Sequence, residues 1–346
     1  MNYRKFFVTA LAAGTALAMQ SAQARPLTVV GWGGAAQEVQ NKVYFQPFEQ
    51  QTDSKMSQDS YSGGLAKVKA MVDSKTVTWD VVTVEDPELL RGCETGLFEP
   101  IDWKIVGAED QFIEGATSEC GVGSYVWSTA LAYNTDTLKV GPKNWADFWN
   151  VQKFPGKRGL RKGVKSNLEF ALMADGVAPT EVYKVLSTPE GVDRAFRKLD
   201  ELKPHIQWWE AGAQPPEWLA SGDVVMTSAY NGRITAANKE GKHFQVVWSG
   251  QVYSVDSFAV VKGSPNKKQA MQFIGFASQP DNQKNYPIEI PYGPTHKAAV
   301  EKVPAKVAKD LPTHPDNLKT ALREDTMFWL DYQDELTQRF NAWVAR

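Results

Sequence analysis

Short apolar runs alternate with amphipathic segments along the first part of the chain. Residues 27–32 form an apolar run that ends in two glycines, and residues 39–50 follow it with apolar side chains at helical spacing. A second helical segment over 65–74 leads to an apolar run of β-type over 79–84. Strands that alternate with helices in this way predict an α/β architecture with largely parallel sheets.

The same alternation continues through the rest of the chain. The spacing predicts helices over 145–149, 167–175 and 192–202, and strands over 224–228 and 244–248. Two longer segments, 124–134 and 252–261, have the pattern of extended strands with no polar linker beside them. Because no Gly/Ser-rich or Pro-rich stretch divides the chain, such strands are the expected connection between two lobes.

Residues 1–24 have the pattern of an export signal. Two basic residues precede a small-residue apolar run over 6–19, and Ala22-Gln23-Ala24 supplies the A-x-A pattern after which signal peptidase cuts. The apolar run is too short to span a bilayer, and no cysteine lies at the cut to carry a lipid. We therefore expect a soluble periplasmic protein whose signal peptide is cleaved after Ala24.

Composition and charge exclude several classes of protein. The 346 residues are 42% apolar and 23% charged, which is typical of a globular chain with enough material for two domains. Lysine and arginine number 38 against 40 acidic residues, so the chain lacks the basic field that attracts phosphate backbones, and we expect no nucleic-acid partner. The chain contains no run of eighteen apolar residues, so it is not a multi-span membrane protein.

The chain has two cysteines, Cys93 and Cys120. In an oxidising compartment an isolated pair usually forms a disulfide, and two free thiols are the alternative. A bridge that closes a loop of this length adds about 3 kcal/mol of stability in the chain-entropy model. Because neither cysteine has a second ligand at C-x2-C spacing, the pair is a poor metal site. We expect no metal and no cofactor.

Signatures of catalysis are missing from the sequence. None of the four histidines lies in an H-E-x-x-H pattern, and the nucleophile-elbow, P-loop and dinucleotide-binding glycine patterns are absent. An S-x-x-K string over 264–267 lies in a segment with turn composition, which makes it a poor nucleophile candidate. We therefore predict that the protein is not an enzyme. A secreted α/β hydrolase or lyase without a recognisable motif is the alternative.

Aromatic residues are the unusual feature of the composition, with 12 Trp, 11 Tyr and 16 Phe. Tryptophan and tyrosine rings beside a carboxylate can enclose an ammonium group, because the ring faces are electronegative. Any one of these rings can equally be a half-buried packing residue. As a set they favour an amine-binding site, and those at loop-like or strand-end positions are Trp32, Tyr61, Trp127, Trp208, Trp209, Tyr230 and Tyr253.

Five stretches of the chain carry motifs in a fixed order. They are WDVV at 79–82, GLFEPID at 96–102, NWADFW with KFPGK at 144–157, VMTSAYNG at 225–232 and YSVDSFAV at 253–260. In this order they resemble the periplasmic spermidine/putrescine-type solute-binding proteins of bacterial ABC importers. Each motif alone is weak, but the colinear set spans nearly all of the chain after the export signal.

The resemblance implies a two-lobed periplasmic-binding-protein fold of type II, with discontinuous α/β lobes joined by hinge strands. A small amine-bearing solute would be trapped in the cleft on closure, and the partner would be an inner-membrane ABC permease. We expect a monomer. The chain would cross between lobes near Ala130, Asp256 and Lys297, so that lobe one holds 25–129 plus 257–297, and lobe two holds 130–256 plus 298–346.

The resemblance also implies which residues contact the solute. Trp32 follows the first strand and matches a cleft aromatic of the family, and Tyr230 stands where the family has a cleft tryptophan. Tyr253 and Asp256 match a tryptophan–aspartate pair whose carboxylate clamps an ammonium, so Asp256 is the strongest candidate. The full predicted ligand-binding set is Trp32, Tyr61, Ser62, Glu85, Trp127, Lys162, Tyr230, Tyr253 and Asp256.

One turn departs from the family pattern. Polyamine receptors carry acidic residues there, whereas this chain has Arg161, Lys162 and Lys165. Basic side chains would repel a second ammonium and suit a carboxylate on the same ligand; alternatively, the two lysines point to solvent. A polyamine would use Asp256 with Glu85 or Glu210 as a second clamp. A zwitterion such as 4-aminobutyrate or a betaine would place its carboxylate at the basic turn, and that turn favours the zwitterion.

Overall fold

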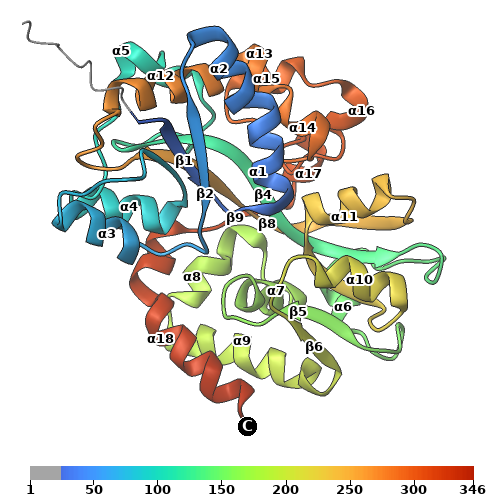
Figure 1. Cartoon of the computed structure of the whole chain (residues 1–346). Coiled ribbons are helices and arrows are strands. Elements are labelled where there is room, and N and C mark those ends of the chain that lie inside the picture. The colour runs from blue at the N-terminus through green and yellow to red at the C-terminus, as the bar shows by residue number, and fades with distance from the viewer. Residues whose placement is uncertain (1–24) are drawn as a thin grey trace, which may run out of the picture.

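The computed structural model describes residues 25–346, so the predicted signal peptide and its cut after Ala24 lie outside the described residues. Figure 1 shows two α/β bodies, one above the other, with strands β4 and β8 running between them. No helix within residues 25–346 combines the length and the apolar character that a membrane span requires.

One mixed sheet of nine strands extends through both bodies in the described part of the chain. Its order is β2-β1-β3-β8-β4-β7-β5-β6, with β9 paired to β8. The two long central strands are antiparallel to each other. The strands are β1 (Leu27–Gly31), β2 (Met56–Ser60), β3 (Val81–Glu85), β4 (Gly121–Asn134), β5 (Arg158–Arg161), β6 (Ile206–Trp209), β7 (Met226–Tyr230), β8 (Phe244–Val260) and β9 (Leu322–Arg323).

The predicted parallel pairing is correct on both flanks of the sheet and wrong at its centre. β1 is parallel to β2 and β3, and β5 is parallel to β6 and β7. In contrast, β8 is antiparallel to β3 and β4, and β4 is antiparallel to β7. The difference arises because β4 and β8 are not part of a strand–helix–strand unit; each passes from one body to the other.

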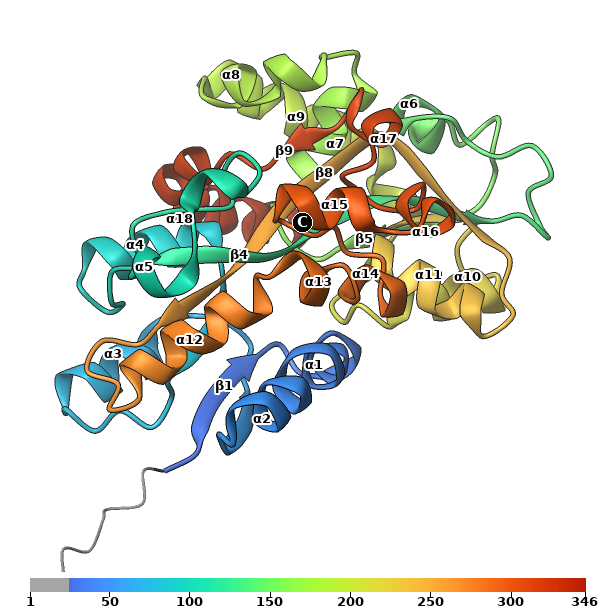
Figure 2. The ribbon, with the colours of Figure 1, turned by 90° about the horizontal axis from the view of Figure 1, so that it is seen from above.

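Helices cover the faces of the sheet in both bodies (Figures 1 and 2). In the upper body they are α1 (Gly34–Gln40), α2 (Gln46–Thr52), α3 (Ala66–Asp73), α4 (Asp86–Glu94), α5 (Trp103–Val106), α12 (Lys267–Ala277), α13 (Pro280–Gln283), α14 (Tyr286–Glu289), α15 (Lys297–Lys302), α16 (Ala305–Ala308) and α17 (Pro315–Leu318). In the lower body they are α6 (Trp145–Trp149), α7 (Asn167–Ala174), α8 (Val182–Leu186), α9 (Pro189–Leu202), α10 (Gln214–Ser221), α11 (Asn231–Lys239) and α18 (Thr326–Val344).

Shorter helical turns connect some of these elements. A π-helical turn, Asn41–Phe45, makes α1 and α2 continuous, so the helix predicted over 39–50 is observed. The other short turns are 3-10 helices at Glu109–Gln111, Pro179–Glu181 and Lys203–His205. Helix starts follow local capping chemistry, as where the Asn144 side chain accepts a hydrogen bond from the Asp147 amide at the start of α6.

The molecule has two main hydrophobic cores, one in each of the two bodies. Buried residues of the first core come from 27–126 and 255–292, and those of the second come from 131–252 and 322–340. The changeovers fall within β4 and β8. The lobe boundaries expected near Ala130, Asp256 and Lys297 stay a prediction. Helices α15 and α16 pack against α13 and α14, so the chain reaches the second core only at β9.

Cys93 in α4 and Cys120 beside the first residue of β4 form a disulfide. It closes a loop with a sequence separation of 27 residues and ties α4 to the start of a strand that joins the two bodies. The predicted bridge is therefore present, and the alternative of two free thiols does not hold in this structure.

Replacing both cysteines with alanine should lower the free energy of unfolding by about 3 kcal/mol, because the unfolded chain regains the freedom that the closed loop removes. Urea unfolding of the mature protein, followed by tryptophan fluorescence, measures this difference. The bridge lies outside the lining of the cavity described below, so solute affinity should not change. An unfolding midpoint equal to that of the wild type would contradict the prediction.

Candidate functional site

A cavity of about 250 Å³ lies where the carboxyl ends of parallel strands from both bodies meet. Crevices at this edge of an α/β sheet are the usual position of a ligand site. Glu85, Arg161 and Tyr230 are the last residues of β3, β5 and β7, and Trp32 follows β1. The lining comprises Trp32, Gly33, Ala36, Ser62, Glu85, Tyr125, Trp127, Arg161, Gly212, Tyr230, Arg233, Asp256 and Tyr292.

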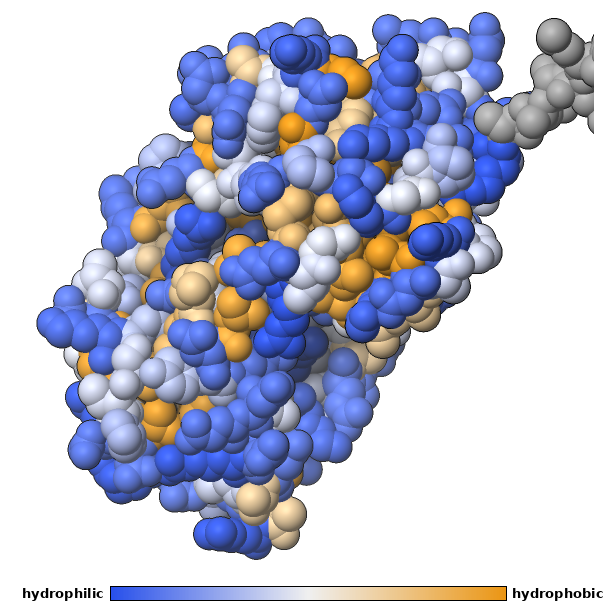
Figure 3. Space-filling view, turned by 90° about the vertical axis from the view of Figure 1, so that its left-hand side faces the viewer, coloured by the Kyte–Doolittle hydropathy of each residue, from blue (hydrophilic) through white to orange (hydrophobic). Residues whose placement is uncertain are grey.

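The face toward the viewer in Figure 3 is hydrophilic over most of its area, with hydrophobic patches gathered around its middle. The cavity itself differs from this outer surface, because aromatic rings and charged groups make up most of its wall. Such a lining suits a small solute that has both apolar and ionic parts.

Asp256 organises the aromatic wall of the cavity. Its Oδ2 atom accepts hydrogen bonds of 2.6 Å from the Trp32 indole and from the Tyr125 hydroxyl, and its Oδ1 atom accepts one of 2.6 Å from the Trp127 indole. Only 3% of Asp256 is exposed. One carboxylate therefore fixes two aromatic side chains of β4 and the one that follows β1. The sequence predicts Asp256 but not its partner Tyr125.

Burial is the main influence on the charge of Asp256. It raises the pKa of this carboxyl to about 8, and the nearby Glu85 carboxylate adds to the rise. The hydrogen bonds from Tyr125, Trp127 and Trp32 oppose that rise in pKa, because they favour the ionised form. A cation placed in the cavity would favour the ionised form further.

The remaining rings hold the wall in place. Trp32 stacks on Tyr61 at a centroid distance of 5.1 Å, and the Tyr61 hydroxyl donates to the Thr83 carbonyl. Tyr230 meets the edge of Trp127 at 5.5 Å. Tyr61 thus lies behind Trp32 rather than in the lining, where it fixes the orientation of the indole. The turn after Trp32 places Gly33 at φ 69°, a left-handed conformation that favours glycine.

Two arginines of the lining, Arg161 and Arg233, give the cavity positive charge. Arg161 is exposed at the end of β5, and Arg233 is half-buried in the first turn of α11. Neither guanidinium has an ion-pair partner within residues 25–346, whereas Arg25, Arg194, Arg323 and Arg339 do. Arginine presents a planar fork of donors that matches a carboxylate. Two unpaired guanidinium groups in one cavity therefore offer a carboxylate site.

The position of Arg233 is set by the residue that begins α11. Asn231 is buried, its side-chain amide donates to the Pro291 carbonyl, and its Oδ1 atom accepts from the Ser128 amide. These bonds fix the start of the helix against β4 and against the loop that follows α14. Arg233 was not among the sequence-predicted residues, although it lies one position beyond the motif over 225–232.

Three residues of the predicted ligand-binding set, Tyr61, Lys162 and Tyr253, lie outside the lining. Lys162 is exposed and pairs with Glu210 at 2.8 Å, so it follows the alternative in which it points to solvent. Lys165, the other lysine of this turn, does not point to solvent, because its ammonium lies 2.8 Å from Glu324 and 3.6 Å from Glu85. Tyr253 and Tyr61 are also absent from the lining. The structure brings together the other six: Trp32, Ser62, Glu85, Trp127, Tyr230 and Asp256.

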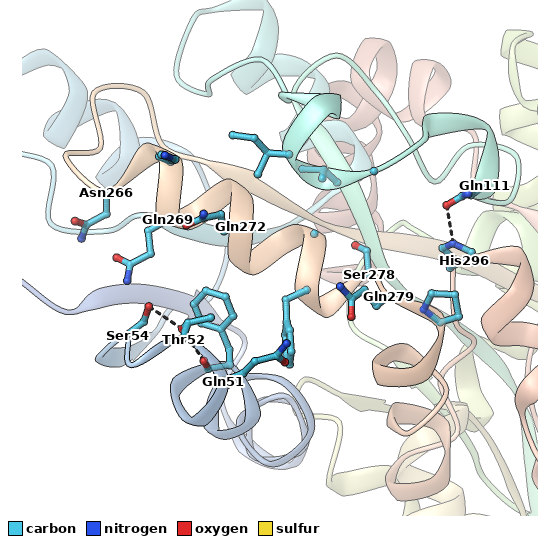
Figure 4. Close-up of a pocket in the computed structure, with 18 of the residues that line it drawn as sticks. Gln51, Thr52, Ser54, Gln111, Asn266, Gln269, Gln272, Ser278, Gln279 and His296 are labelled. Atoms are coloured by element: carbon cyan, nitrogen blue, oxygen red, sulfur yellow. Dashed lines mark hydrogen bonds between the residues drawn. The ribbon is translucent and has the colours of Figure 1, made fainter.

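A larger hollow of about 830 Å³ lies on the upper body, between α2, α5 and α12. Figure 4 shows that amide and hydroxyl side chains dominate it, including Gln51, Gln269, Gln272 and Gln279, while His296 bonds to Gln111. It has no pair of opposite charges and no tryptophan in its lining. The smaller cavity is therefore the better candidate for an ionic solute.

The chain is similar to known solute-binding proteins. Residues 44–314 match the family described as bacterial extracellular solute-binding protein. The chain is 57% identical to the gamma-aminobutyric acid-binding protein of Pseudomonas aeruginosa over 95% of this chain and 94% of that protein. It is 25% identical to a putrescine-binding periplasmic protein of Escherichia coli over 90% of both chains.

A solved structure shares the fold. The structure of a GABA receptor superposes with a TM-score of 0.84 at 33% identity, and the match covers 93% of this chain and 98% of that one. The α/β periplasmic-binding-protein fold expected from the sequence is thereby confirmed.

Proposed function

The chain belongs to the bacterial extracellular solute-binding protein family, and on that premise we propose that its cleft binds 4-aminobutyrate. It is a substrate-binding protein of the kind that serves ABC transporters. The observation behind the proposed ligand is the lining of the cavity. Two guanidinium groups, Arg161 and Arg233, share about 250 Å³ with the Asp256 carboxylate and its tryptophans, and neither has an ion-pair partner among residues 25–346.

The acidic and aromatic end of the cavity suits an ammonium. Asp256 and Glu85 are direct partners across β8 and β3, so both carboxylates lie close together on one wall. The faces of Trp32 and Trp127 add quadrupole attraction for a cation. We assign the ammonium of 4-aminobutyrate to this end.

The basic end suits a carboxylate. Arg161 and Arg233 come from two elements of the lower body, β5 and α11, and both line the same cavity. A second ammonium at this end would meet two guanidinium groups, so a linear polyamine is disfavoured by charge. Sequence identity also favours the zwitterion. The chain is 57% identical to the gamma-aminobutyric acid-binding protein and 25% identical to the putrescine-binding protein.

The other expectations from the sequence belong to the same proposal. The protein would be periplasmic and monomeric after cleavage behind Ala24, and an inner-membrane ABC permease would receive the solute. Closure would occur about β4 and β8, which would join lobe one (25–129 plus 257–297) to lobe two (130–256 plus 298–346). The matched relatives are named as binding proteins or receptors, which favours a receptor over a hydrolase or lyase.

Incubation of ligand-stripped protein with 4-aminobutyrate tests the receptor proposal against the enzyme alternative. We expect the melting temperature to rise with ligand concentration, because a ligand that binds only the folded state stabilises it. After denaturation, chromatography should recover the ligand unchanged. A product that accumulates with time would overturn the receptor assignment.

Affinity for 4-aminobutyrate should increase as the pH rises toward 8. The Asp256 carboxyl, with a pKa of about 8, must lose its proton before it can pair with an ammonium, so affinity changes by up to about tenfold per pH unit below that value. Titrations across this range measure the slope. A pH-independent dissociation constant would contradict the assignment of Asp256.

The ligand-free protein should show the opposite trend in stability. The folded-state pKa of Asp256, about 8, lies above the unfolded value of about 4, so the folded state binds the proton more tightly. The resulting stability is complete at low pH and is lost as the pH rises from about 4 to about 8. Burial raises the pKa values of Asp86 and Glu169 to about 7 and contributes with the same sign.

A further inference from the structure

Lys165 is a charged residue that the proposed site does not use. It lies in the turn between β5 and α7, and only 19% of its side chain is exposed. Its ammonium is 2.8 Å from Glu324 and 3.6 Å from Glu85. Glu85 belongs to the cavity wall, whereas Lys165 does not, so the lysine reaches an acidic residue of the wall from outside the lining.

The ammonium of Lys165 is held in its charged form by these neighbours. Burial alone would lower the pKa of Lys165, but the Glu324 and Glu85 carboxylates outweigh that effect and raise it. Glu324 is only 5% exposed and Glu169 is fully buried nearby. Without Lys165, the Glu85 and Glu324 carboxylates would lose the one cation that forms ion pairs with both of them within residues 25–346.

The spacing of the carboxylates relates Lys165 to the proposed ligand. Glu85 is the direct partner of Asp256 across two antiparallel strands, and such partners have Cβ atoms about 5 Å apart. One cation can pair with Asp256, and a second cation, the Lys165 ammonium, already lies 3.6 Å from Glu85. The Lys165 ammonium therefore lies beside the carboxylate that is the strand partner of Asp256.

Resting on the proposed 4-aminobutyrate site, we propose that Lys165 is a specificity-determining residue that occupies a second cation position beside Glu85 and thereby excludes diamines. A ligand with a single ammonium uses Asp256 and leaves this position to the lysine. A diamine would need to displace a cation that is part of the chain and that is anchored by Glu324. The site would therefore discriminate against diamines by repulsion between the Lys165 ammonium and the second ammonium of the diamine.

The test compares putrescine binding by the wild type and Lys165→Ala, which removes the ammonium and empties its place. We expect the dissociation constant for putrescine to fall by about tenfold or more in Lys165→Ala. Adding Glu85→Gln to this variant should abolish the gain, because the second ammonium would lose its carboxylate. Lys162→Ala is the matched control, since Lys162 is exposed in the same turn and pairs with Glu210 instead.

The outcomes separate this inference from the proposed function. An unchanged affinity of folded Lys165→Ala for putrescine would overturn the inference while leaving the 4-aminobutyrate site intact. Wild-type protein that does not bind 4-aminobutyrate would overturn the proposed function itself. If Lys165→Ala does not fold, Lys165→Ala combined with Glu324→Gln removes the buried unbalanced carboxylate and should still gain affinity for putrescine through Glu85.

Discussion

Replacing Asp256 with alanine should weaken 4-aminobutyrate binding by roughly 2 to 5 kcal/mol, the usual effect of removing one partner of a buried charge pair. The ligand ammonium loses its counter-charge, and Trp32, Tyr125 and Trp127 lose the acceptor that fixes them. Each donor left without a partner also costs about 1–3 kcal/mol of folding stability. Calorimetric titration and urea unfolding of the same preparation measure both effects.

Two further variants separate the charge of Asp256 from its hydrogen bonds. Asp256→Asn keeps one acceptor oxygen, so it should recover part of the stability but little of the affinity. Asp59→Asn is the matched control, because Asp59 also accepts a hydrogen bond from an indole, that of Trp79 at 2.8 Å, away from the cavity. If Asp256→Ala bound 4-aminobutyrate as tightly as Asp59→Asn does, Asp256 would not belong to the ammonium site.

Replacing Arg233 with methionine should weaken 4-aminobutyrate binding by about 2 kcal/mol, because hydrogen bonds between charged groups contribute about 1.5–3 kcal/mol each. That difference corresponds to about a 30-fold larger dissociation constant. Methionine keeps much of the length of the side chain, so the change is mainly one of charge. Titration of the variant and of wild type under one buffer condition measures it.

The chemistry of the ligand provides the control for Arg233. An analogue that keeps the amine but replaces the carboxylate with a neutral amide should bind the wild type and Arg233→Met with similar affinity. Arg339→Met is the matched protein control, since Arg339 pairs with Asp193 and packs over Phe196 away from the cavity. An equal loss of affinity for both ligands would show that Arg233 supports the structure of the cavity instead of the carboxylate.

Much of the fold could be predicted from the sequence because hydrophobic spacing is local. The helix over 145–149 and the strands beginning at 27 and ending near 134 agree with α6, β1 and β4. The antiparallel centre of the sheet could not be predicted in this way. Pairing between β4 and β8 joins residues more than a hundred positions apart, and no spacing within either segment determines its direction relative to the other.

The candidate site was predictable where strand periodicity or a strand end determined the direction of a side chain. Asp256 and Tyr253 are three residues apart in β8, so their side chains point to opposite faces of the strand. Periodicity alone therefore argues against placing both in one cavity. The direction of Lys162 and Lys165 follows from contacts with Glu210 and Glu324, which are distant in sequence and carry no local signal.

Calorimetric titration of ligand-stripped mature protein with 4-aminobutyrate and putrescine, under one buffer condition, shows which of the two ligands the cavity prefers. The two molecules share an amine on a short chain and differ in whether the other end is a carboxylate or a second ammonium. We predict one 4-aminobutyrate bound per chain and much weaker binding of putrescine. Tighter binding of putrescine would contradict the assignment of Arg161 and Arg233 as the carboxylate site.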